Sequence, residues 1–319
     1  MLGNRKIIID VLVILVSFAV FVIWYESTFK NNVALSSTMK HYQVYLVTTD
    51  KTNKKWVDID KGATDMANLI GVTYKWESPE DAKAEELVKV INQIVDSGAD
   101  AILVASHDAV QIANVIEDAK AHGVKIIYLY STAYEEAVVT LATDHFDAGI
   151  TAAETMLYEL NAIGVHSGKI GIVGQKEDDT LTTDREKGFR ETIEKNGKFE
   201  LLPTVYSSSH YGNYQKGAEY FIKEYPDLVG LYGTNTDATI GIGNAIRNSN
   251  KEIVGIGFDH NDLIESLINS GDLKAVLTEN VYTMGYLGVA EAIAALKGLI
   301  TGPAFINTDV KVINEYTHH

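Results

Sequence analysis

The chain has 319 residues, 46% of them hydrophobic, so it is long enough for two globular cores and too apolar to be disordered over most of its length. Its 43 acidic residues outnumber 27 basic ones and give a formal net charge of -16. This disfavours a nucleic-acid partner, because phosphate backbones bind clustered lysine and arginine. The sequence contains no cysteine, which excludes disulfides, cysteine-based zinc sites and thiol nucleophiles.

The amino-terminal residues predict a membrane anchor. Residues 7–25 are mostly apolar, with Asp10 as the only charge, and two basic residues precede them. Such a stretch is long enough to cross a bilayer as a helix. We therefore predict a transmembrane anchor at residues 1–25, a linker at residues 26–40, and a single-pass protein in the cell membrane whose remaining residues are extracellular. The alternative is a cleaved signal peptide.

From residue 42 the sequence alternates between short apolar runs and longer amphipathic stretches. The runs predict strands at residues 42–48, 72–76, 101–105, 125–130 and 138–142. The amphipathic stretches predict helices at residues 56–70, 79–97 and 109–121. Apolar strands separated by amphipathic helices are typical of a parallel sheet that is covered on both faces.

The same alternation restarts at residue 145. Strands are predicted at residues 169–173, 201–206, 228–232, 253–258 and 274–278, and a last extended piece at residues 306–313. Helices are predicted at residues 145–163, 183–195, 211–225, 263–269 and 281–297, with a further one between the strands at 228–232 and 253–258.

Two half-chains with one topology predict an α/β fold of two doubly wound parallel-sheet lobes. We assign residues 41–143 and 279–303 to an amino-terminal lobe, and residues 144–278 and 304–319 to a carboxyl-terminal lobe. The chain then crosses three times between the lobes, which predicts a hinge.

Polar side chains follow two apolar strands of the second half. Asn235 and Asp237 follow the strand at residues 228–232, and Asp259 ends the run at residues 253–258. In open α/β sheets ligands bind beyond the carboxyl ends of the strands. A carboxylate accepts two hydrogen bonds at once and an amide both donates and accepts, so these residues suit a ligand with paired hydroxyls. The alternative is that the two aspartates start the helices that follow them.

Motifs of enzymes and of nucleotide binding are missing from the sequence. The glycine pairs Gly241/Gly243 and Gly255/Gly257 lack the third glycine of a dinucleotide fingerprint, and no phosphate-binding loop, nucleophile elbow or zinc ligand set occurs. The acidic run at residues 177–179 has no second carboxylate that the sequence places opposite it, as a glycosidase needs. We therefore predict a protein without catalytic activity, metal or cofactor.

Several segments carry a resemblance to a known family: YLVTTDKTNKKWVDIDKGA at residues 45–63, LYST at residues 129–132, LTTDREKGF at residues 181–189, and the two strand ends. From about residue 42 to residue 313 the chain resembles the type 1 periplasmic sugar-binding proteins, the ribose, xylose and galactose group that shares its fold with LacI-type repressors. A repressor needs a basic helix-turn-helix at the amino terminus, where this chain has an apolar stretch.

In the first half, the resemblance places Asn53 and Trp56 at sugar-contacting positions. The Trp56 ring would cover the apolar face of a sugar, and the alternative is that this residue belongs to the core. Lys55 stands where a second aromatic residue is common, and the alternative for it is a salt bridge to a carboxylate of the cleft. Tyr130 and the serine after it replace an Asp-Arg pair of the family.

In the second half, the resemblance implies sugar contacts at five further positions. Arg185 keeps one arginine of the family's motif, whereas Thr183 replaces the other. Asn235 and Asp259 match ligand residues of the family, and Glu279 falls where ribose binders use glutamine. These departures argue against ribose. Asp237 completes the predicted ligand-binding set.

The resemblance, together with the predicted anchor, implies a receptor that closes on a monosaccharide. It is similar to membrane-anchored xylose receptors that signal to a sensor histidine kinase of a two-component system, which favours a pentose such as D-xylose as the ligand. The alternatives are the substrate-binding component of a sugar ABC transporter, with a membrane permease as its partner, and an autoinducer-2 receptor.

Overall fold

The computed structural model describes residues 41–81, 83–105, 112–130, 137–175, 180–207, 211–299 and 301–317. The predicted anchor at residues 1–25, the linker at residues 26–40 and the acidic run at residues 177–179 lie outside these ranges. Within them, no helix has both the length and the apolar character that a membrane crossing requires. Both sheets of the protein belong to one compact unit, Gln43–His319.

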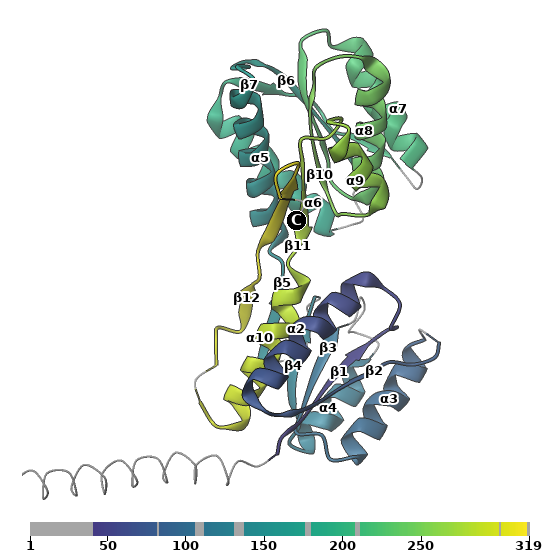
Figure 1. Ribbon diagram of the computed structural model, residues 1–319, viewed down its shortest axis with the longest axis vertical. Coiled ribbons are helices and arrows are strands. Elements are labelled where there is room, and N and C mark those ends of the chain that lie inside the picture. The colour runs from purple at the N-terminus through teal and green to yellow at the C-terminus, as the bar shows by residue number, and fades with distance from the viewer. Residues whose placement is uncertain are drawn as a thin grey trace, which may run out of the picture. The chain divides into compact units, whose positions relative to one another are not determined.

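The first sheet has six parallel strands (Figure 1). Their spatial order is β12 (Phe305–Asn307), β5 (Val139–Ala142), β4 (Lys125–Leu129), β3 (Ala101–Ala105), β1 (Gln43–Thr48) and β2 (Thr73–Glu77). Because side chains alternate along a strand, each face has its own partners. Leu103 and Leu129 lie against α10 (Val281–Leu296), which packs on α2 (Lys54–Ile70). Tyr45 and Ile102 share a core cluster with α3 (Ala84–Asp96) and α4 (Ala113–Ala121).

The second sheet has seven strands. Its order is β13 (Val310–Asn314), β11 (Ala275–Glu279), β10 (Val254–Phe258), β9 (Leu228–Gly233), β6 (Gly168–Gln175) and β7 (Phe199–Leu201), and β8 (Val205–Ser207) also pairs with β6. Strand β13 runs antiparallel to β11. Phe189 and Phe258 lie in the core under α5 (His145–Ala162) and α6 (Thr180–Asn196). Phe221 and Leu231 lie in the core on the other face, with α7 (Tyr211–Glu224), α8 (Thr236–Ser249) and α9 (Asp262–Asn269).

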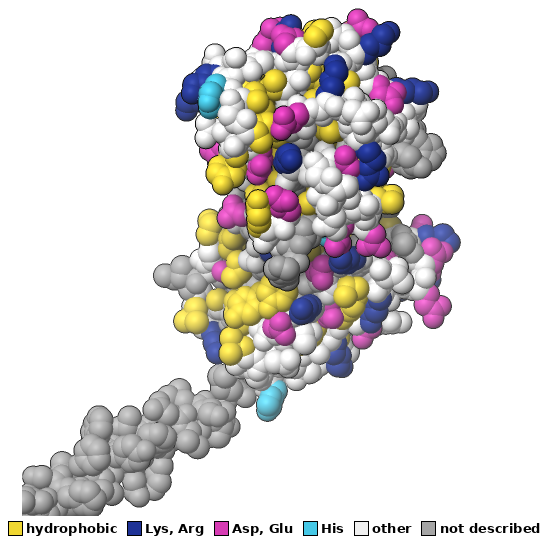
Figure 2. Space-filling model, turned by 45° about the horizontal axis from the view of Figure 1, so that its top comes forward, with side chains coloured by type: hydrophobic (Ala, Val, Ile, Leu, Met, Phe, Trp, Pro, Cys, Tyr) yellow, Lys and Arg dark blue, Asp and Glu magenta, His cyan; other side chains and the backbone are white. Residues whose placement is uncertain are grey.

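The predicted α/β fold of two doubly wound lobes is therefore confirmed. The central strands β1, β3, β4, β9 and β10 are buried on both faces, as parallel strands between two helical layers must be. On the face of the molecule in Figure 2, acidic and basic side chains lie interspersed over the surface.

The single strand predicted at residues 201–206 is wrong. The structure has two short strands there, β7 and β8, and both pair with β6. Pro203 lies between them. Proline has no N–H to donate to a sheet ladder, so the pairing stops and restarts on either side of it.

The single extended piece predicted at residues 306–313 is also two strands, β12 and β13, and this changes the predicted lobe boundary at residue 303. Strand β12 continues the ladder of β5 in the first sheet, whereas β13 joins the second sheet. The boundary predicted after residue 303 is therefore too early, and the chain leaves the first lobe only after Asn307. The backbone turns at Asp309, which has a left-handed φ of 57°. Only Thr308 and Asp309 join the two strands.

Candidate ligand-binding site

Two residues with unusual backbone geometry lie at the carboxyl ends of strands, one in each lobe. Tyr130 follows β4 with a φ of 75°, and Asp259 follows β10 with a φ of 71°. Each donates its backbone N–H to the neighbouring strand, Tyr130 to the carbonyl of Leu141 at 2.9 Å and Asp259 to that of Leu277 at 2.8 Å. A left-handed conformation costs a non-glycine residue about 1–2 kcal/mol, so both side chains are held in place against strain.

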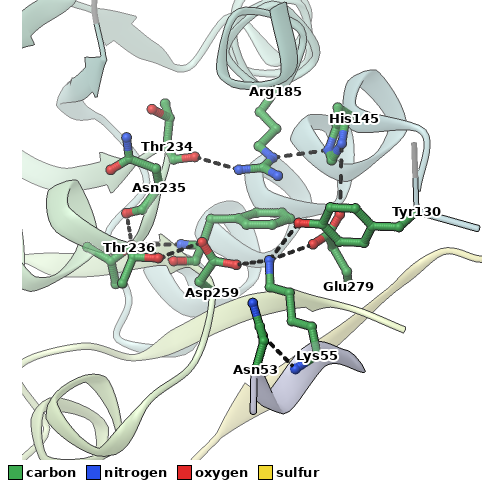
Figure 3. A network of polar contacts seen from close by, with 12 residues as sticks. Asn53, Lys55, Tyr130, His145, Arg185, Thr234, Asn235, Thr236, Asp259 and Glu279 are labelled. Carbon is green, nitrogen blue, oxygen red and sulfur yellow. Dashed lines mark hydrogen bonds and ion pairs between the residues drawn. The ribbon is translucent and has the colours of Figure 1, made fainter. Parts of the chain in front are cut away.

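The ammonium group of Lys55 joins these two residues (Figure 3). Its Nζ donates to Tyr130 Oη at 2.8 Å and to Glu279 Oε2 at 2.9 Å, and it lies 3.4 Å from Asp259 Oδ1. Lys55 is in α2 of the first lobe. Glu279, which the predicted boundary at residue 279 assigns to the first lobe, instead ends β11 and pairs with β13 in the second sheet, so that boundary is one residue too early. The interaction thus connects the lobes. It confirms the alternative prediction for Lys55, a salt bridge to a carboxylate of the cleft.

Lys55, Tyr130, Asp259 and Glu279 form the Lys55 cluster, and their surroundings determine which of these groups are charged. Burial disfavours the Lys55 ammonium, but the carboxylates of Asp259 and Glu279 outweigh it and raise the pKa of Lys55. Burial acts against ionisation of Asp259, yet Lys55 and Arg185 together lower the pKa of its carboxyl. Burial and the Glu279 carboxylate raise the pKa of Tyr130 to about 12. At neutral pH the site therefore holds a cation, an anion and a neutral phenol side by side.

Arg185 extends the cluster on the second lobe. Its guanidinium lies 3.5 Å from the centre of the Phe258 ring, and its Nη1 donates to the carbonyl of Thr234 at 3.0 Å. Its Nε donates to His145 Nδ1 at 3.2 Å, and His145 Nε2 lies 3.9 Å from Glu279 Oε1. The sequence analysis predicted Arg185 but missed His145 and Phe258. No local motif marks those two, because they meet Arg185 only once α5 and α6 pack on the sheet.

Two asparagines of the predicted set cap helices. Asn53 Oδ1 accepts the backbone N–H of Lys55 at 3.0 Å, at the start of α2. Asn235 Oδ1 accepts the N–H of Ala238 at 2.9 Å, at the start of α8, and its Nδ2 donates to Gln175 Oε1 at 3.0 Å. Only part of each side chain is therefore available to a ligand.

The two aspartates of the predicted set differ in position. Asp237 lies in the first turn of α8, and it makes no hydrogen bond or ion pair with the Lys55 cluster in the part of the chain that the structure describes. Its position fits the alternative that it starts a helix. Asp259 does not cap the helix after it, because Asn261 does so by accepting the N–H of Ile264 at 3.0 Å. Instead, Asp259 Oδ2 accepts a hydrogen bond of 2.7 Å from Thr236.

The predicted stacking role of Trp56 is wrong, and the alternative of a core residue is right. Trp56 has no exposed surface, and its ring meets the edge of Tyr130 at a centroid distance of 5.3 Å. It belongs to the buried stripe of α2 with Ile59 and Ala63. Helical spacing of three and four residues puts these side chains on the face toward the sheet, so the ring has no surface open to a ligand.

A pocket of about 420 Å³ adjoins the cluster, which is within the usual size of a small-molecule site. It is lined by Lys54, Lys55, Asp58, Lys61, Thr236, Asp259, His260, Asn261, Thr278, Glu279, Val281, Tyr282, Lys311 and Ile313. The half-buried Thr183 of α6 is outside this lining. Thr236, His260 and Asn261 were missed, although Thr236 begins the helix after β9 and the other two stand in the loop after β10, where the sequence points to a ligand. No metal-binding group of three or more suitable side chains occurs in the described ranges.

Comparisons with known proteins agree with this architecture. Residues 44–300 match the family model described as periplasmic binding protein domain. The ribose import binding protein RbsB of Haemophilus influenzae is 24% identical over 281 residues, covering 88% of this chain and 94% of that protein.

Two solved structures share the fold. AraP, an arabinose binding protein from Geobacillus stearothermophilus, has a TM-score of 0.77 and 22% identity, covering 87% of this chain and 98% of that chain. A mutant XylFII–LytSN complex has a TM-score of 0.76 and 22% identity, covering 88% of this chain and 99% of that chain.

Proposed function

We propose that this chain, which belongs to the periplasmic binding protein family, binds a monosaccharide in the pocket at the Lys55 cluster. The family consists of binding proteins and not of enzymes, so the chain is not an enzyme, and it is placed outside the cytoplasm. The relatives named for ribose and arabinose support a pentose as the ligand. D-xylose stays the favoured pentose on the sequence resemblance.

The observation that carries this proposal is the position of Asp259, which lines the pocket with its carboxylate 3.4 Å from the ammonium of Lys55. Its carboxylate is kept ionised by Lys55 and Arg185, and it adjoins the pocket at the end of a strand. Adjacent sugar hydroxyls donate well to a single carboxylate, and an ionised acceptor makes these hydrogen bonds strong. The Lys55 ammonium and the Asn53 amide nitrogen lie nearby as donors to ring oxygens.

Contacts from both lobes give the ligand a means of changing the conformation. Lys55 and Tyr130 belong to the first lobe, and Asp259 and Glu279 to the second. A ligand that bonds to both groups stabilises the closed arrangement, because only this arrangement lets it make all its hydrogen bonds.

Delivery of the sugar to an ABC transporter is the biological role that the comparisons favour. The relative RbsB is named as an import protein, and it covers most of this chain. A second role, that of a membrane-anchored receptor that signals to a sensor histidine kinase, is supported by the apolar residues 7–25 and by the likeness to the XylFII–LytSN complex.

Thermal melting with a panel of sugars tests the binding proposal. A ligand that binds only the folded state raises its stability by RT ln(1 + [L]/Kd), so D-xylose, L-arabinose, D-ribose and D-galactose are compared at equal concentration, with autoinducer-2 as a further probe. We expect a pentose to give a clear shift and to be recovered chemically unchanged. The absence of a shift with every sugar would contradict the proposal.

The amino terminus of the mature protein separates the two roles. A receptor held beside a kinase keeps the apolar segment, so its mature form begins at Met1 or Leu2. A mature form that begins near residue 30 indicates a released protein and favours transport. Co-purification from membranes then identifies the partner as a permease or a kinase.

A further inference from the structure

The pocket differs in charge from the chain as a whole. The chain has a formal net charge of -16, yet more lysines than carboxylates line the pocket. The lysines are Lys54, Lys55, Lys61 and Lys311, and the carboxylates are Asp58, Asp259 and Glu279. The fully ionised lining therefore carries one positive charge in excess.

The excess comes from the lysines of the lining other than Lys55. Lys55 is held by Asp259 and Glu279. Lys54, Lys61 and Lys311, in contrast, form no ion pair with any residue that the structure describes, although Asp58 stands between the first two on α2.

Several lysines on other helices are paired, although Lys195 of α6 and Lys216 of α7 have no ion pair with any residue that the structure describes. Lys89 lies 2.7 Å from Glu86, Lys120 lies 2.6 Å from Glu117, and Lys187 lies 3.1 Å from Asp184. Each of these pairs joins neighbours on one helix, so it neutralises its own part of the surface. Lys54, Lys61 and Lys311 differ from these pairs because they line the pocket, where a ligand can supply a negative charge.

We propose that the ligand is a monosaccharide that carries a carboxylate, a uronic or aldonic acid, whose acid group faces Lys54, Lys61 and Lys311. This inference rests on the proposed function, since it assigns the chemical class of the sugar in the same pocket. An excess of positive charge at a concave site raises the local concentration of anions and their rate of association. The single excess charge matches one carboxylate and not a phosphate, which carries about -1.5 to -2 at neutral pH.

The pentose preference of the proposed function is compatible with an acid. D-glucuronate has the ring hydroxyls of D-xylopyranose with a carboxylate added at C5, and D-galacturonate has those of L-arabinopyranose with the same addition. Asp259 then binds ring hydroxyls in either case, and the added carboxylate is the group that the lysines recognise. Each acid and its neutral counterpart form a matched pair for experiment.

Calorimetric titration of the full chain with both matched pairs tests the inference. We expect at least one acid to bind about tenfold or more tightly than its neutral counterpart, as charge complementarity at a partly exposed site permits. Raising the salt concentration should weaken binding of the acid and leave that of the neutral sugar nearly unchanged, because salt screens exposed charges. Equal or weaker binding of both acids would overturn the inference while leaving monosaccharide binding intact.

Variants show whether these lysines cause the preference. The triple variant Lys54→Gln, Lys61→Gln, Lys311→Gln should lose most of the ratio between acid and neutral affinities. A control with the same change in net charge, Lys89→Gln, Lys120→Gln, Lys187→Gln, should keep the ratio. A ratio that is unchanged in the first triple variant would also overturn the inference. Binding of neither acids nor neutral sugars would contradict the proposed function itself.

Discussion

Tyr130 and Asp259 occupy equivalent places in the two lobes, and they differ only in chemistry. Each is the residue after the strand that lies fourth from the β2 or β7 edge of its sheet, each has a left-handed φ, and each donates its N–H to the next strand. Both contact the ammonium of Lys55. One side chain is a neutral phenol and the other is an ionised carboxylate.

The comparison shows which property belongs to the fold and which to the side chain. The repeated topology provides the same strained position at both strand ends, so each lobe presents one side chain to the other. The residue type at that position then decides the strength of the contact, because a hydrogen bond to an ionised group is about twice as strong as one between neutral groups. We therefore expect unequal effects when the two positions are altered.

The largest effect is expected for Asp259→Ala. It removes the ionised acceptor for ring hydroxyls and one of the two counterions of Lys55. Calorimetry with the best sugar ligand should show affinity reduced by about 100-fold or more, the scale of losing hydrogen bonds to a charged group. Asp237→Ala is the matched control, since it removes the same charge from a helix start. The sugar affinity of the Asp237→Ala variant should stay within about twofold of that of the wild type. An equal loss of affinity in both variants would contradict the different roles assigned to Asp237 and Asp259.

The next largest effect is expected for Lys55→Met, which removes the partner that both positions share. Asp259 and Glu279 then lose a common counterion while they stay mostly buried. Urea unfolding should show a loss of about 1–3 kcal/mol, less than the 3–5 kcal/mol of a fully buried pair because Lys55 is partly exposed. Without ligand, small-angle scattering should show wider separation of the lobes. The exposed Lys54→Met variant serves as the control, and a Lys55→Met protein as stable and as compact as wild type contradicts the expectation.

A smaller effect is expected for Tyr130→Phe. This change removes the hydroxyl that accepts from Lys55 but keeps the ring against Trp56. Unfolding stability should fall by about 0.5–1.5 kcal/mol, the usual contribution of one hydrogen bond. Affinity for the sugar should fall less than in the Asp259→Ala variant. A loss as large as that of Asp259→Ala would show that the phenol and the carboxylate are equivalent after all.

The smallest effect concerns pH. The folded state lowers the pKa of Asp259, so its contribution to stability is complete above the ordinary carboxyl pKa of about 3.9. That contribution is lost as the pH falls through the lower pKa of the folded state. Wild type should therefore lose more unfolding free energy than the Asp259→Asn variant when the pH is lowered from about 5 to about 3. The unfolding free energy of each protein is measured by urea titration at each pH. If the two free energies change in parallel with pH, the pKa of Asp259 is not lowered in the folded state.

Much of the fold could be predicted because apolar runs dictate buried strands. The strands at β9 and β10 were placed within one residue, and their carboxyl ends pointed to Asp259. The sequence did not predict that β12 and β13 are separate strands, because the pattern of residues 306–313 indicates one continuous extended segment. Its division depends on pairing with two different sheets.

The site was harder to predict because it depends on which face of a helix a residue occupies. Lys55 and Trp56 are neighbours in sequence, yet one faces the cleft and the other the core. The spacing of Trp56 with Ile59 and Ala63 did contain this information, since it favours the alternative that Trp56 belongs to the core. No spacing in the sequence indicated the contact between Arg185 and His145, since these two residues are 40 positions apart and lie on different helices.

The short connection between β12 and β13 limits how the molecule opens. Two residues, Thr308 and Asp309, join a strand of one sheet to a strand of the other, and a chain spans at most about 3.6 Å per residue. At that edge the sheets are tethered too closely to move apart by translation. Opening must therefore be a rotation whose axis passes near the tether, so that the displacement of any atom grows with its distance from Thr308.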